Sequence, residues 1–254
     1  MIVRAVRAEW VKLSTVRATR WTLASSIALG LVIVALVAWV TRNTESTSED
    51  GILLALAPFT GLAGMPGIAV IFSAVVGILS ITSEVRFNTI RTTFLAVPNR
   101  PIALTAKTAV VAVVCALAFL VAEWLAMGLF LLIGGGGPGF SATGAGASAY
   151  LTLPLAAGLA SILGVAVGTA IRNAAGAITV LLAYMLVVES VISAVPQTRD
   201  AAPYLPMTNF ENLLGIALPS TTMPWPAWGS LIYLIVVIGA LWAGAVALIA
   251  RRDA

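Results

Sequence analysis

Six stretches of about 20 mostly apolar residues, the length at which a helix crosses a bilayer, limit the folds open to this chain. Only 9% of its 254 residues are charged and 60% are hydrophobic, proportions that water-soluble domains do not have. The sequence therefore predicts an all-α polytopic membrane protein, a single transmembrane domain over residues 1–254. The six spans are expected at residues 21–40, 62–82, 108–133, 150–171, 174–195 and 228–250.

The distribution of basic residues predicts how these spans are oriented. With six spans both termini lie on one side of the membrane, and 12 of the 14 lysines and arginines fall on that side. Only Arg42 and Arg199 fall on the other. Because Lys and Arg concentrate in cytoplasmic segments, we expect both termini in the cytoplasm. The net charge of +4 then reflects topology, and we expect no nucleic-acid partner.

Residues 1–20, ahead of the first span, have the pattern of a helix that lies in the inner membrane interface. Apolar residues, Trp10 among them, share one side, whereas Lys12 and other basic residues share the opposite side. Glu9 and Arg17 lie at the boundary. Such a basic face is expected to contact anionic lipid head groups. A simple positive-inside anchor with a frayed start is the alternative interpretation.

The external segment 196–227 carries six prolines and precedes the last predicted span. Within it, Thr208 and Glu211 have the spacing of a capping box and are followed by apolar residues as far as Leu218. We therefore expect a short apolar helix that begins at Thr208 and lies at the outer leaflet.

Several kinds of chemistry are excluded by residues that the sequence lacks. There is no histidine, and Cys115 is the single cysteine, so no disulfide, Cys cluster or His-based catalytic site is expected. A phosphate-binding P-loop needs Gly-Lys-Ser/Thr, but the only lysines, Lys12 and Lys107, follow Val11 and Ala106. A Ser–Lys dyad on Lys107 is the one hydrolytic alternative. We expect neither an enzyme nor a cofactor or metal site in this chain.

Two carboxylates, Glu123 and Glu189, fall inside predicted spans. An ionised carboxylate in hydrocarbon is costly, so each must be protonated, hydrated in a cavity or hydrogen-bonded by neighbours such as Ser190 or Ser193. They line a transport route in one interpretation, and in the other they only join helices or reach the outer interface.

Small residues repeat every four positions along the predicted fourth span, at Ala156, Ala160, Gly164 and Gly168. Such a stripe lets another helix backbone approach closely. It predicts a packing seam, either within one subunit or between two.

The connector between the second and third spans, residues 83–101, is the most charged part of an otherwise apolar region. Its sequence, SEVRFNTIRTTFLAVPNRP, continues as IALTAK into the third span. This stretch resembles a cytoplasmic segment of ABC transporter permeases of the type-2 exporter class. EWVKLSTVRATRW, residues 9–21, is similar to the interfacial "elbow" helix of those permeases. The likeness covers the layout of the whole chain but is confined, at motif level, to these two segments.

The resemblance implies a permease subunit that does not hydrolyse ATP itself. In that family the connector docks into a separate cytoplasmic ATPase, which binds ATP and Mg, and two permease copies join around an export route. The expected ATPase contacts are Glu84, Arg86, Thr89, Arg91 and Arg100, with the elbow residues Glu9, Trp10, Lys12 and Arg17 beside them. The expected location is a bacterial plasma membrane.

Two other functions stay open from the sequence. One is a secondary, proton-coupled carrier that uses Glu123 and Glu189, and the other is a non-transporting membrane scaffold or immunity protein. The arginines of the connector would then only enforce topology and hold lipid head groups.

Overall fold

The computed structural model describes residues 2–43, 51–62, 64–87, 89, 100–134, 149–216 and 222–251, apart from the side chains of 2–5, 14, 51–54, 100, 134 and 149. Six of its helices, one of them interrupted, are long and apolar enough to cross a membrane, which confirms the predicted all-α polytopic fold. These helices are α2 (Arg17–Asn43), α4 (Ile68–Arg86), α6 (Arg100–Gly134), α7 (Ala149–Ile171), α8 (Ala174–Ala183) with its continuation, and α11 (Ala227–Arg251).

Helices α4 and α7 form the centre of the bundle, because their backbones approach each other closely along a stripe of small residues. A methyl group added to Gly164 would lie 2.0 Å from the carbonyl oxygen of Ala74, and one added to Gly77 would lie 2.1 Å from that of Ser161. Gly168 likewise faces Ile78 of α4. The seam predicted on the fourth span is therefore used within the chain, and Ala156 and Ala160 of the same stripe are fully buried.

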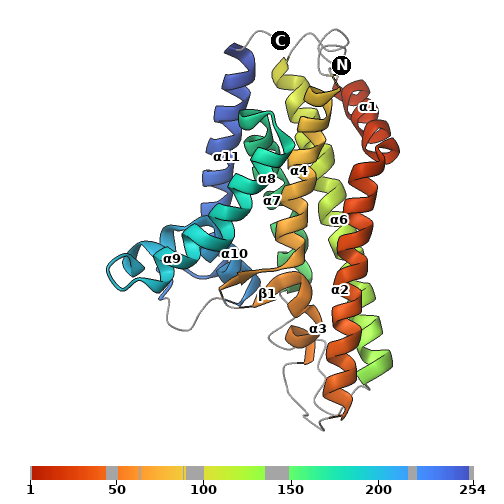
Figure 1. Ribbon diagram of the computed structural model, residues 1–254, viewed down its shortest axis with the longest axis vertical. Helices are drawn as coiled ribbons and strands as arrows, with labels where there is room; N and C mark the ends of the chain where they lie inside the picture. The colour runs from red at the N-terminus through yellow and green to blue at the C-terminus, as the bar shows by residue number, and fades with distance from the viewer. Residues whose placement is uncertain are drawn as a thin grey trace.

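The first helix, α1 (Ile2–Thr15), is separated from α2 by a break at Val16. It packs against α6, and it lies at the same end of the bundle as the C-terminal end of α11 (Figure 1). Leu13 on its inner side joins a small apolar cluster with Val76 of α4 and Val110 of α6. The interfacial segment of the prediction is thus a helix that is anchored in the bundle by its inner face.

A short helix and a hairpin, which the sequence analysis did not predict, precede the second span. Helix α3 (Gly51–Thr60) packs against α2, where the Phe59 ring occupies the space that a side chain at Gly30 would need. Strands β1 (Gly61–Leu62) and β2 (Met65–Pro66) pair antiparallel, with positive φ at Gly64 in the turn between them and at Gly61 in β1. The second span therefore begins at Ile68 rather than near Leu62.

The fifth span is not a regular helix throughout. After α8, one π-helical stretch, η2 (Tyr184–Val188), leads into α9 (Glu189–Ala194). A π-helical insertion of this kind often marks a functional position in a helix. Here it comes directly before the carboxylate at Glu189.

The segment that was expected to be external folds into η3 (Arg199–Tyr204) and α10 (Pro206–Leu214) before α11 begins (Figure 1). The capping-box prediction is wrong: α10 begins at Pro206, so Thr208 lies inside the first turn and caps nothing. Proline suits this first helical position because its missing N–H would have no helical partner there. Gly215 ends the helix with a positive φ of 75°, and Leu218 lies outside the described residues.

Candidate functional site

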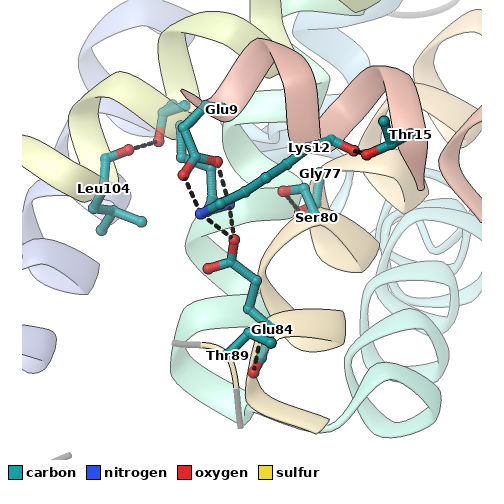
Figure 2. A network of polar contacts seen from close by, with 10 residues as sticks. Glu9, Lys12, Thr15, Gly77, Ser80, Glu84, Thr89 and Leu104 are labelled. Carbon is teal, nitrogen blue, oxygen red and sulfur yellow. Dashed lines mark hydrogen bonds and ion pairs between the residues drawn. The ribbon is translucent and has the colours of Figure 1, made fainter. Parts of the chain in front are cut away.

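Four charged side chains meet inside the protein between α1, α4 and α6. Figure 2 labels three of them, Glu9, Lys12 and Glu84. The Lys107 ammonium nitrogen lies 2.6 Å from Glu9 Oε2 and 2.9 Å from Glu84 Oε1. Lys12 Nζ lies 2.7 Å from Glu9 Oε1 and 2.9 Å from the same oxygen of Glu84. Two lysines and two glutamates thus form one closed, charge-balanced cluster, called the charge cluster below.

Burial makes these contacts stronger than ion pairs on a surface. Glu9, Glu84 and Lys107 are each no more than 7% exposed, and only Lys12 has a partly accessible side chain. A buried charge is tolerated only when it is paired and hydrogen-bonded, and removal of one partner is costly. Partial burial lowers the pKa of Lys12, but the hydrogen bonds to Glu9 and Glu84 outweigh it, so the pKa of this lysine is raised.

The charge cluster holds both ends of the connector that follows the second span. Glu84 lies in the last turn of α4, at the N-terminal end of the connector, and Lys107 lies in the early turns of α6, just past its C-terminal end. Glu9 and Lys12 add α1 to the same cluster. The charge cluster therefore joins the two ends of the connector to each other and to α1 by direct side-chain contacts.

The predicted contact residues do not share one surface. Glu84 was expected to touch a partner, but the structure directs its carboxylate into the protein, where lysines neutralise it. Arg86 is exposed, with its guanidinium 5.6 Å from the Phe87 ring centre. Thr89 is also exposed, and its hydroxyl donates to the Glu84 carbonyl oxygen at 3.4 Å. Arg91 and the side chain of Arg100 lie outside the described residues.

The elbow residues divide between the inside and the outside of the protein. Trp10 and Arg17 are exposed at the surface of α1 and at the start of α2. Glu9 is buried, and Lys12 was expected on the lipid-facing basic side but instead turns towards two carboxylates. Glu9 is three residues before Lys12 on α1, a spacing that the sequence shows, but the second carboxylate, Glu84, comes from α4 and no helical pattern of α1 could reveal it.

A second polar arrangement lies where α9 meets α10. The carboxylate of Glu189 accepts hydrogen bonds from the backbone N–H groups of Met207, at 2.8 Å, and Thr208, at 3.3 Å. These are amides of the first helical turn, which have no partners within the helix. The N-terminus of α10 is thus capped by a side chain from the fifth span, whereas the sequence analysis had named Ser190 and Ser193 as partners for Glu189.

Glu211 of α10 extends this second arrangement to the hairpin before α4. Its carboxylate accepts a hydrogen bond from the backbone N–H of Gly64, yet burial dominates and raises the pKa of Glu211 to about 7. Glu189 and Glu211 line a cavity of about 220 Å³, with Arg199 also in its wall. Two carboxylates therefore connect α9, α10 and the hairpin, as the charge cluster connects three helices at the other end.

Glu123 stands apart from both arrangements. It is fully buried in α6, and neither carboxylate oxygen has a hydrogen-bond partner among the residues that the structure describes. The structure therefore does not bring Glu123 and Glu189 together into a common hydrogen-bonded pair. The sequence allowed a buried carboxyl group to be protonated, hydrated or hydrogen-bonded by a neighbour. Within the described part of the chain, no neighbour forms a hydrogen bond with the Glu123 carboxyl group.

Comparison with known proteins adds no identification. No protein-family model matches the chain, and no curated protein matches it significantly in sequence.

Proposed function

We propose that this chain is the membrane-spanning subunit of an ATP-driven exporter, moved from the cytoplasmic side by a separate ATPase that grips the connector at residues 83–101. One observation carries this proposal: the charge cluster ties both flanks of the connector, through Glu84 and Lys107, to the buried side of α1. A loop that only enforced topology would need exposed arginines and no such internal anchorage.

The packing of α4 supports a path from the connector into the membrane. Glu84 fixes its cytoplasmic end, and the close contact of Gly77 with Ser161 couples it to α7. At the far end α4 follows the hairpin that Gly64 joins to Glu211 of the external helix α10. A pull on the connector would thus reach the second arrangement through one helix.

The energy source in this proposal is a partner subunit that holds ATP and Mg, because the sequence has no P-loop lysine. Two permease copies would enclose the route, in a bacterial plasma membrane with both termini in the cytoplasm. The cargo is not specified by any described residue.

Affinity purification of the tagged full chain from its native membranes, after mild cross-linking, tests the proposal directly. A cassette-type ATPase should be recovered with the chain, and its ATP hydrolysis should respond to the permease. The double variant Arg86→Ala/Arg91→Ala should lose this ATPase while inserting normally. The matched control is Arg251→Ala, which removes an exposed charge at the same end of the bundle. If the double variant retains the ATPase as well as this control does, the coupling role is wrong.

A proton-coupled carrier is the second candidate, and the isolated carboxyl group of Glu123 is the observation that favours it. A buried acid without a partner is a plausible site for a proton that moves during transport. Transport by the reconstituted chain alone, abolished when the proton gradient is dissipated, would establish this function in place of the first.

A further inference from the structure

Two adjoining cavities flank the junction of α1 and α2, and they differ in character. The larger, about 440 Å³, lies beside the charge cluster and is also lined by hydroxyl groups, Ser83 and Thr19 among them. The smaller, about 130 Å³, is lined mainly by the apolar side chains of Trp10, Leu23 and Val114. Leu13 and Thr19 belong to both linings, so the polar and apolar spaces lie next to each other.

All four charged residues of the charge cluster line the polar cavity, and Lys12 is the most exposed of them. The side chain of Lys12 is 38% exposed, whereas those of Glu9 and Glu84 are 5% and 9% exposed. Arg20, an exposed residue, lines the neighbouring apolar cavity. The most exposed charged side chains of the two linings, Lys12 and Arg20, are thus cationic, and together with the hydroxyl group of Ser83 they suit a phosphate group.

The surrounding tryptophans place this junction at the level of lipid head groups. Trp10 and Trp21 are 54% and 71% exposed, and exposed tryptophans of a membrane protein concentrate at the membrane–water interface. Basic pockets between helices on the cytoplasmic side are a typical arrangement for binding anionic lipid head groups. A molecule with an anionic head and an apolar tail fits these neighbouring cavities, with its head in the polar cavity and its tail in the apolar one.

We propose that the two cavities bind one anionic phospholipid, its phosphate held by Lys12 and Arg20 and one acyl chain lying against Leu23 and Val114. This goes beyond general attraction of a basic helix to a charged membrane, because it requires a single saturable site with defined walls. It rests on the membrane location of the bundle and not on the proposed export function. The bound lipid would brace α1 against α2 beside the charge cluster.

Native mass spectrometry of the delipidated full chain in detergent, titrated with phosphatidylglycerol, tests this site. One molecule per chain should be retained saturably, and phosphatidylcholine should bind more weakly. Arg20→Gln should lower the affinity about fivefold or more, since one nearby basic residue contributes about that factor. The matched control is Arg17→Gln, an exposed arginine of the same helix that lines neither cavity, and it should leave the affinity unchanged.

Three results would overturn the proposal. Equal weakening by Arg17→Gln and Arg20→Gln would mean general surface attraction, and equal binding of phosphatidylcholine would remove the role of the negative charge. Binding of glycerophosphoglycerol, the head group without its chains, as tightly as the intact lipid would show that the apolar cavity is not used. Lys12 is left unchanged in these variants because its removal would also break the charge cluster.

Discussion

Glu84 and Lys107 form a buried ion pair with 2.9 Å between Oε1 and Nζ, although they are 23 residues apart in the chain. The connector that runs between them is therefore closed at its base by a direct side-chain contact. Glu9 and Lys12 complete the same cluster from α1, so one polar centre fixes three helices in the apolar bundle.

Replacing Lys107 with methionine should destabilise the protein strongly. The change leaves Glu9 and Glu84 with a single lysine in a buried site, and breaking a buried pair costs about 3–5 kcal/mol. Thermal unfolding in detergent should show a large fall in the melting temperature, while Arg251→Gln, an exposed charge change, should have almost no effect.

The combination of Lys107→Met with Glu84→Gln provides the control for this interpretation. Removal of both charges avoids the unpaired carboxylate, so the double variant should be more stable than the sum of the two single changes indicates. Strict additivity of the two effects would show that these residues do not interact in the folded protein.

Gly77→Ala should disrupt the contact between α4 and α7. The added methyl group would lie 2.1 Å from the Ser161 carbonyl oxygen, so the two backbones must separate, and such overpacking typically costs about 1–3 kcal/mol. The yield of folded protein and its melting temperature should both fall.

Gly158→Ala on α7 is the matched control for this packing prediction. Its methyl group would meet its nearest neighbour, the Ala112 carbonyl oxygen, at 3.5 Å, which is an ordinary contact. Alanine also favours a helix over glycine, so this variant should be as stable as the original chain or slightly more stable. Equal losses in the two variants would contradict the close approach at Gly77.

The spans could be predicted because membrane thickness requires about 20 consecutive apolar residues in every crossing helix, and such runs are visible in the sequence. The residue at which α4 begins could not be predicted, because a few glycines between two apolar runs allow either a continuous helix or a turn. The structure has a hairpin at this place, and two of its residues, Gly61 and Gly64, adopt positive φ.

The candidate site was only partly visible in the sequence. Glu84 was singled out because charge is rare in this chain, but its partner Lys107 lies in another helix, and no periodic pattern links them. The residue that caps α10 was not predicted for the same reason. Thr208 had the right local spacing, but the backbone amides of the first turn bind the carboxylate of Glu189 from the fifth span. Local patterns predict helices, whereas contacts between helices depend on how they pack.

The stability of α10 and the segment around it should depend on pH through Glu211. Burial raises its pKa from 4.5 to about 7 in the folded protein. The folded state therefore binds the Glu211 proton more tightly than the unfolded state does. The stability that this proton contributes is complete below pH 4.5 and is lost as the pH rises through about 7. Glu211→Gln cannot lose a proton, so the variant should keep this stability at higher pH.

Melting temperatures of the original chain and of Glu211→Gln should be compared between pH 5 and 8. The difference between the two proteins separates the effect of Glu211 from the titration of other carboxylates, which both proteins share. The advantage of the glutamine variant should grow with increasing pH, by several degrees over the range. A constant difference between the two proteins would mean that Glu211 does not change its protonation state there. Amide hydrogen exchange in α10 should follow the same trend, because Glu211 also binds Gly64 of the hairpin.

Glu123→Leu should make the protein more stable, because it removes a fully buried carboxyl group that has no partner among the described residues. Leaving such a polar group unsatisfied costs about 1–3 kcal/mol, and an apolar side chain of similar volume removes that cost. An increased melting temperature in detergent is the expected result, and a decrease would show that Glu123 has a stabilising contact. The transport assay then separates the two proposed functions. An ATP-driven exporter moved through the connector should keep its activity in this variant, whereas a proton-coupled carrier that depends on Glu123 should lose it despite the gain in stability.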